Sequence, residues 1–161
     1  ITGSLQCGAS ELDLTLCDVT FEEGTIVGEV YHTTTLLLGL PFEIPHFIME
    51  KEDRFLDRAL AFAGFQDIDF QRFTKFSKRF VVMGPDEQRI RELMTPELLE
   101  FFENERVYHL ESVGDEIVIF ETFMRRATVA EVQNMLGFAE RLMAMLASKA
   151  TDSAANAEKL A

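Results

Sequence analysis

The spacing of apolar residues changes along this chain, and the change limits the folds that it can adopt. Between residues 11 and 21 apolar and polar side chains alternate, which places Leu12, Leu14 and Leu16 on one face. This is the pattern of a strand that is buried on one side. Near the C-terminus, from Val132 to Leu146, apolar residues recur every three or four positions, as in an amphipathic helix. Separate segments with these two periods predict a sheet and helices that share one core.

The first part of the chain contains two further segments that are typical of strands. Residues 26–38 are rich in Val, Tyr, Thr and Leu, and they follow a predicted turn at Glu23–Gly24. A short apolar run, His46–Met49, comes directly after Pro45. Because consecutive strands with short connections usually lie side by side, we expect the three strands to form an antiparallel meander.

The middle of the chain predicts short helices around one buried strand. Apolar residues have helical spacing between positions 55 and 63, and Gly64 can end that helix. Segment 65–76 favours neither a helix nor a strand, whereas Phe80–Met83 is a short apolar run that is typical of a buried strand. The sequence Gly84–Glu87 predicts the start of the next helix, because its proline suits the first turn and its acids suit the positive end of the helix dipole.

Capping and turn residues predict the elements that follow. Thr95 as N-cap and Pro96 at the first helical position predict a helix that ends near Asn104. This helix either stands in tandem with the preceding one or continues it through a kink. Residues 107–112 and 116–123 then flank a short turn that contains glycine, which predicts a β-hairpin.

The order of these elements predicts the fold class. Thr128 and Glu131 have the spacing of a capping box at the start of the last helix. The expected order is βββ-α-β-α-ββ-α, which indicates an α+β fold with a mainly antiparallel sheet. The helices should pack on one face of the sheet, because the alternating strands have only one apolar side. We expect one domain over residues 1–149 and a flexible tail over residues 150–161, whose last residues are typical of an expression-vector remnant.

The excess of acidic side chains limits the kinds of partner that the chain can bind. With 28 Asp and Glu against 15 Lys and Arg, the formal net charge is −13. Nucleic acid is therefore not an expected partner, because non-specific binding requires cations that neutralise phosphates. No apolar run approaches the ~18 residues that a membrane-spanning helix needs, so we expect a cytoplasmic domain. Membrane association is expected only through an anchor upstream of Ile1 in the full-length gene.

One basic segment with interleaved aromatic residues stands out against this acidic background. Residues 71–80 contain four cations and no acid. Aromatic rings next to cations can bind anionic ligands or partners. The simpler alternative is that the rings pack in the core and the cations balance acids elsewhere. The candidate interaction patch consists of Arg72, Phe73, Lys75, Phe76, Lys78 and Arg79.

Several short segments around this patch form a pattern, and they are Pro45–Glu50, Asp67–Phe70, Phe76–Phe80, Gly84–Glu87 and Ile90–Leu98. In this combination they resemble a group of bacterial proteins that has no assigned activity and in which the pattern often lies downstream of membrane-spanning segments. The resemblance extends from Leu36 to Phe120. It implies a bacterial source and a soluble domain that can be tethered to a membrane, and it implies no activity.

The remaining residues that could carry chemistry have spacings that favour structural roles. Asp67 and Asp69 are two positions apart, but no further oxygen ligands follow in series as a calcium loop requires. The histidines His32, His46 and His109 lack the short spacings of metal sites. We therefore predict no metal site, no cofactor and no catalytic residue. An enzyme would require His46 or His109 to meet the two aspartates in a cleft.

The two cysteines add little to the functional prediction. Cys7 and Cys17 are too few for a disulfide framework, so they are expected as free or buried thiols, with one disulfide as the alternative. A nucleophilic pair of Cys17 with His32 is not expected, because a thiol buried in an apolar strand is inert.

A non-enzymatic interaction module is the function that these observations favour. Its partner would be an unknown protein or a second copy of the chain. The alternative is a small-molecule-binding domain with an apolar pocket between the sheet and the helices, which the 15 Phe residues would suit.

Overall fold

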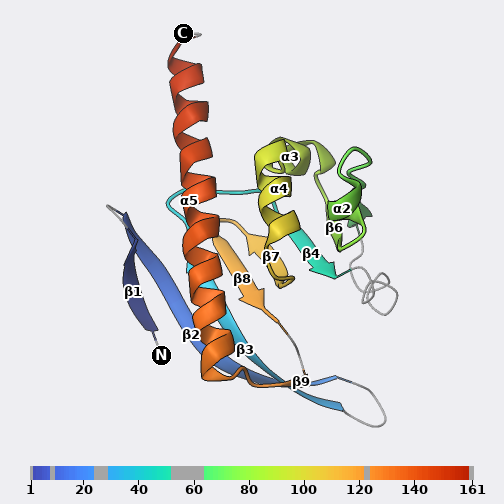
Figure 1. The fold of residues 1–161 in the computed structure, drawn as a ribbon, viewed down its shortest axis with the longest axis vertical. Helices are drawn as coiled ribbons and strands as arrows, with labels where there is room; N and C mark the ends of the chain where they lie inside the picture. The colour runs from blue at the N-terminus through green and yellow to red at the C-terminus, as the bar shows by residue number, and fades with distance from the viewer. Residues whose placement is uncertain (1, 8–9, 24–28, 52–63, 122–123, 160–161) are drawn as a thin grey trace.

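The computed structural model describes residues 2–7, 10–23, 29–51, 64–121 and 124–159. Within these residues, nine strands form one sheet, with helices packed on one of its faces (Figure 1). The strands are β1 (Thr2–Cys7), β2 (Ser10–Glu23), β3 (Glu29–Gly39), β4 (Phe47–Lys51), β5 (Gln66–Asp67), β6 (Phe80–Gly84), β7 (His109–Val113), β8 (Glu116–Phe120) and β9 (Met124–Arg125). The helices are α2 (Thr74–Ser77), α3 (Glu87–Leu93), α4 (Pro96–Asn104) and α5 (Val129–Lys159). The predicted α+β class with a mainly antiparallel sheet is confirmed.

The order of the strands corrects the predicted meander. The sheet has the order β1-β2-β3-β8-β7-β4-β6-β5, and β9 pairs with β3 in parallel. The strand predicted at His46–Met49, which is β4, therefore does not lie beside β3. It is a central strand with four of its five residues buried, and it pairs with β7 on one side and β6 on the other. The hairpin of β7 and β8 fills the place between β3 and β4.

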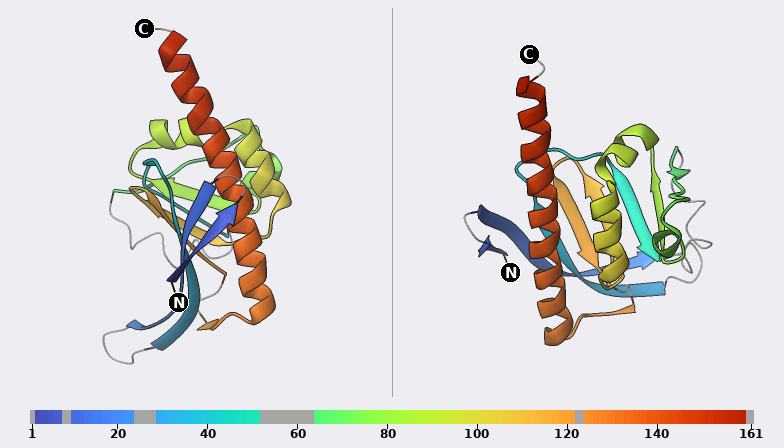
Figure 2. Two further views of the ribbon diagram at one scale, coloured as in Figure 1. Left: turned by 90° about the vertical axis from the view of Figure 1, so that its left-hand side faces the viewer. Right: turned by 45° about the horizontal axis from the view of Figure 1, so that its top comes forward.

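The main core lies between the sheet and the helices α4 and α5. Every second residue of the central strands faces this core, and α5 runs obliquely across the same side of the sheet (Figure 2). Phe138 of α5 has no exposed surface, and its ring centroid lies 4.8 Å from that of Tyr108 and 5.8 Å from that of Phe101. Around Phe138, close-packed aromatic side chains therefore fill the space between α5, α4 and the sheet.

The structure also refines the boundaries of the central helices. Asp86, and not the proline before it, starts α3, because its carboxylate accepts a hydrogen bond of 3.1 Å from the backbone N–H of Arg89. Pro85 therefore lies outside the first turn of α3. Thr95 is the N-cap residue of α4 and Pro96 its first helical residue, as predicted. The two helices are separate elements and not one kinked helix.

Some predictions fall outside the described residues or concern short elements. The helix expected over residues 55–63 and Gly24 of the first turn lie outside the described part of the chain. Segment 65–76, which favoured neither state, contains β5 and the single turn of α2. The strands β1 and β9 were missed. Helix α5 continues to Lys159, beyond the end expected for the domain at residue 149.

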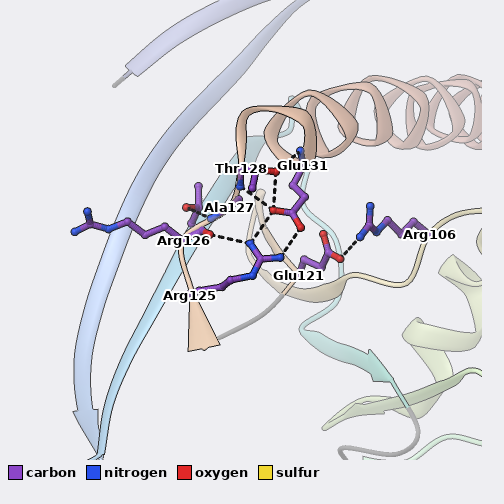
Figure 3. Close-up of polar contacts among 8 residues, drawn as sticks. Arg106, Glu121, Arg125, Arg126, Ala127, Thr128 and Glu131 are labelled. Atoms are coloured by element: carbon purple, nitrogen blue, oxygen red, sulfur yellow. Dashed lines mark hydrogen bonds and ion pairs between the residues drawn. The ribbon is translucent and has the colours of Figure 1, made fainter.

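The predicted capping box at the start of α5 is confirmed (Figure 3). The backbone N–H of Thr128 donates to Glu131 Oε2 at 2.7 Å, and the backbone N–H of Glu131 donates to Thr128 Oγ1 at 3.3 Å. Arg125 donates to both carboxylate oxygens of Glu131, at 2.9 and 2.6 Å. A further bond of 2.9 Å from the N–H of Ala127 to Thr34 Oγ1 attaches this end of the helix to β3.

These contacts predict that the stability of the fold depends on pH through Glu131. The hydrogen bonds from Arg125 and Thr128 hold the pKa of the Glu131 carboxyl well below its usual range. The native state therefore favours the ionised form, so the contribution to stability is complete at neutral pH and is lost as the pH falls from about 5 downward. In urea titrations at neutral and acidic pH, the Glu131→Gln variant should lose less stability on acidification than the wild-type chain.

The control for this prediction is Glu116→Gln, which removes an exposed carboxylate that forms no ion pair with the described residues. The Glu116→Gln variant should keep the pH dependence of the wild-type chain. An equal pH dependence in all three proteins would contradict the role of Glu131.

Candidate functional site

The structure divides the predicted patch into buried and exposed residues. Phe76 is 1% exposed, and its ring stacks on Phe80 at 5.0 Å. Arg79 is partly buried and lies 5.3 Å from the centroid of the Phe80 ring. Arg72, Lys75 and Lys78 are exposed.

Phe76 and Arg79 connect α2 to α4. The backbone N–H of Phe76 donates to Glu103 Oε1 at 3.0 Å. Arg79 donates to the backbone carbonyls of Glu103 and Glu105, the latter at 2.7 Å. The last carbonyls of a helix have no partner within the helix, and Arg79 supplies one at the end of α4. These two residues therefore have structural roles, and the prediction that Phe76 offers a surface for binding is wrong.

Of these exposed cations, Arg72 lines a groove between residues 69–73 and the helices α3 and α4, whereas Lys75 and Lys78 are not among its lining residues. The groove has a volume of about 510 Å³, and its lining includes Phe70, Arg72, Phe73, Arg91, Met94 and Leu99. The turn that forms one wall is held by a hydrogen bond of 2.7 Å from the N–H of Phe73 to the carbonyl of Phe70. Ligand pockets in proteins commonly have volumes of about 300–1,000 Å³, so the groove is large enough for a side chain or a small molecule.

The groove combines an apolar floor with walls that contain two arginines and one aspartate. Leu99 and Met94 are buried core residues whose edges line the groove. The guanidinium of Arg91 lies 5.2 Å from the centroid of the Phe70 ring, and its Nε donates to Glu87 Oε1 at 2.8 Å. Arg72 forms no ion pair with any described residue. This arrangement can hold a ligand that carries both an apolar group and a negative charge.

Sequence reasoning found one side of this groove and missed the other. Arg72 and Phe73 belong to the predicted patch, whereas Arg91 lies on α3, Leu99 on α4, and Met94 in the connection between these helices. The sequence signal for these residues was weak. No local pattern shows which loop packs against α3. A partly apolar helix with one arginine on its face is also typical of ordinary helix surfaces.

A second group of polar residues lies on β4 and β7, on the face of the sheet away from α5. His109 is 6% exposed and Glu50 is 2% exposed, and His109 Nδ1 lies 3.5 Å from Glu50 Oε2. Glu111 lies 3.9 Å from His109 Nε2 through one oxygen and 3.9 Å from His46 Nε2 through the other. The ring of His109 stacks on Phe120 with centroids 4.3 Å apart.

A small cavity of about 260 Å³ opens beside Glu50 and His109. Tyr108, Arg106 and Glu121 also line this cavity, and Arg106 forms an ion pair with Glu121 (Figure 3). Burial raises the pKa of the Tyr108 hydroxyl, so the hydroxyl stays protonated at neutral pH. The cluster therefore contains hydrogen-bond donors and acceptors of both charge types in a confined space.

The histidines do not meet the aspartates, as an enzyme of the expected type would require. His46 and His109 are paired with Glu111 and Glu50. Asp69 accepts a hydrogen bond of 3.4 Å from Ser77 Oγ. The pKa of Asp67 is raised by partial burial of its carboxyl and by the neighbouring charge of Asp69.

The remaining candidates are separate from one another. His32 Nδ1 lies 3.1 Å from Thr20 Oγ1. Cys17 is a free thiol opposite Thr35, so it neither contacts His32 nor forms the disulfide considered as an alternative. Among the described residues, no group of three or more His, Cys, Asp and Glu is arranged to hold a metal ion.

Comparison with solved structures gives a similar fold in the crystal structure of the mycobacterial trehalose monomycolate transport factor A, TtfA. The TM-score is 0.51 at 10% sequence identity, and the match covers 86% of this chain and 74% of the TtfA chain. At this identity the two proteins share the fold alone. Searches with protein-family models and among curated proteins gave no match.

The helices were also compared with the requirements of a membrane span. Within the described residues, none combines the length and the apolar composition that crossing a bilayer requires.

Proposed function

We propose that this chain is a non-enzymatic interaction module that binds a protein partner through the basic surface formed by Arg72, Lys75 and Lys78 together with the groove beside it. The observation that supports this proposal most directly is the exposure of these three cations without ion pairs to described residues, in a chain of net charge −13. Complementary charge accelerates association and favours the correct partner.

The fold comparison and the sequence resemblance support the same class of function. TtfA is described as a transport factor, and a factor that acts within a transport process fits a role in binding. The resemblance to a bacterial group suggests a cytoplasmic domain that is tethered to a membrane in the full-length protein. The partner could also be a second copy of the chain.

Photo-crosslinking in cells tests this proposal. A photoreactive amino acid at Lys75 should crosslink a defined partner, whereas the same group at Val113, which is 55% exposed at the end of β7, should not. Charge reversal by Arg72→Glu with Lys78→Glu should reduce the crosslinked product about tenfold, because each lost charge contact weakens association.

The crosslinking experiment uses Arg126→Glu as a matched control. Arg126 is exposed on a distant part of the surface, near Asp18. This control should leave the yield unchanged. If the Lys75 position gives no partner, or if charge reversal has no effect on the yield, the basic surface has no role in binding.

The alternative function is that the chain binds a small molecule. The observation that favours it is the groove lined by Arg72 and Arg91. Its volume of about 510 Å³ lies within the range of ligand pockets, although it lies outside the interface between the sheet and the helices. Native mass spectrometry of the purified chain would support this alternative if it showed a retained mass of a few hundred daltons.

A further inference from the structure

The groove is lined by the cations Arg72 and Arg91 and by the anion Asp69, and these charges differ in the partners that they already have. Arg72 forms no ion pair with the described residues, so its charge is available to a ligand. Asp69 also lines the groove and is exposed, so it opposes an anionic ligand. The two residues lie on the same turn and should affect an anionic ligand in opposite directions.

Arg91 is held in place before any ligand arrives. Its guanidinium lies over the Phe70 ring, and it forms an exposed ion pair of 2.8 Å with Glu87 one helical turn away. Exposed pairs of this kind contribute little to stability and exchange readily with other partners. A ligand carboxylate can therefore share Arg91 without loss of a strong contact.

The apolar floor of the groove determines which kind of ligand group fits between the charged side chains. Phe73 is half-buried and offers most of the apolar surface, while Met94 and Leu99 line the base with only the small exposed edges of buried side chains. Methionine adapts its shape to different side chains. A purely ionic ligand would leave this surface unused, whereas one aromatic or aliphatic side chain would cover it.

We infer that the groove binds a short acidic segment of a partner protein, with one apolar side chain on Phe73, Met94 and Leu99 and flanking carboxylates at Arg72 and Arg91. This inference rests on the proposed function and specifies the partner's chemistry. Charge complementarity selects the occupant, because Arg72 and Arg91 present cations at this groove in a chain of net charge −13. A second copy is the less suitable occupant, since two chains of net charge −13 repel each other.

Selection from a library of random peptides displayed on phage tests the inference with the purified chain. Enriched sequences should contain acidic residues around an aromatic or aliphatic residue. One enriched peptide is then synthesised with a fluorescent label, and its dissociation constant is measured by anisotropy. Arg72→Gln should weaken binding about tenfold, as expected for a lost charge-assisted hydrogen bond. Asp69→Asn should strengthen binding, and the Arg126→Gln control should leave it unchanged.

The opposite signs distinguish recognition from a structural effect, because loss of local structure would weaken binding in both variants. Enriched peptides without acidic residues, or changes of the same sign in the two variants, would overturn the inference. If a partner still crosslinks at Lys75 in that case, the proposed function stands and the partner uses another part of the basic surface. If that crosslink is also absent, the proposed function fails as well.

Discussion

Replacement of Phe138 by alanine is expected to lower the free energy of unfolding by about 3–5 kcal/mol, the range for removal of a buried aromatic ring. Phe138 has no exposed surface, and its ring contacts Tyr108, Phe101 and Phe102. The cavity would lie between α5, α4 and the sheet, where three elements would have to move together to fill it. The loss is a large part of the ~5–15 kcal/mol that stabilises a typical domain.

Urea denaturation followed by circular dichroism measures this effect. The midpoint should fall strongly for Phe138→Ala and less for Phe138→Leu, which keeps most of the side-chain volume. Val129→Ala on the same helix is the matched control, because Val129 is 76% exposed. Its effect should stay within about 0.5 kcal/mol. An equally small effect of Phe138→Ala would show that α5 is not part of the core.

Replacement of Gly84 by alanine is expected to cost about 1–3 kcal/mol, the usual penalty for overpacking a core. A Cβ atom at Gly84 would lie 2.7 Å from the backbone carbonyl oxygen of His46 and closer still to Cδ1 of Ile90. The Ile90 side chain can change rotamer, whereas the His46 carbonyl belongs to the chain that leads into β4. The end of β6 would therefore have to move away from β4.

Two further variants isolate the cause. Combining Gly84→Ala with Ile90→Val should recover only part of the loss, because the contact with His46 remains. Gly137→Ala places a Cβ in the middle of α5, where the nearest atom is the end of the Arg141 side chain at 3.3 Å. This control should stabilise the chain by about 0.5–1 kcal/mol, as alanine does in a helix. Stabilisation by Gly84→Ala would contradict the packing described here.

The elements that the sequence predicted well are those whose signal is local. The alternation of β2, the hairpin of β7 and β8, and the capping box of α5 each depend on residues close together in the chain. The position of β4 could not be predicted in the same way. Its pairing with β7 depends on a hairpin that lies about sixty residues later, and no local pattern specifies that choice.

The candidate site shows the same division between local and distant information. The composition of residues 71–80 drew attention to Arg72 and Phe73, which line the groove. The composition could not show that the Arg79 side chain donates hydrogen bonds at the C-terminal end of α4. That role depends on where the carbonyls of Glu103 and Glu105 lie. The pairing of Glu50 with His109 was missed for a similar reason, since each residue stands alone in an apolar strand until the register places them side by side.

The arrangement of β3, β8 and α5 has a consequence for the synthesis of this protein. Leu36 of β3 pairs with Ile119 of β8, and the face that both strands present to the core is covered by α5, which follows both strands in the chain. During synthesis the apolar face of β3 therefore stays uncovered until α5 has also been made. Incomplete chains of this kind are prone to aggregation. Until α5 covers it, this apolar surface is open to the chaperones that protect incomplete chains from aggregation.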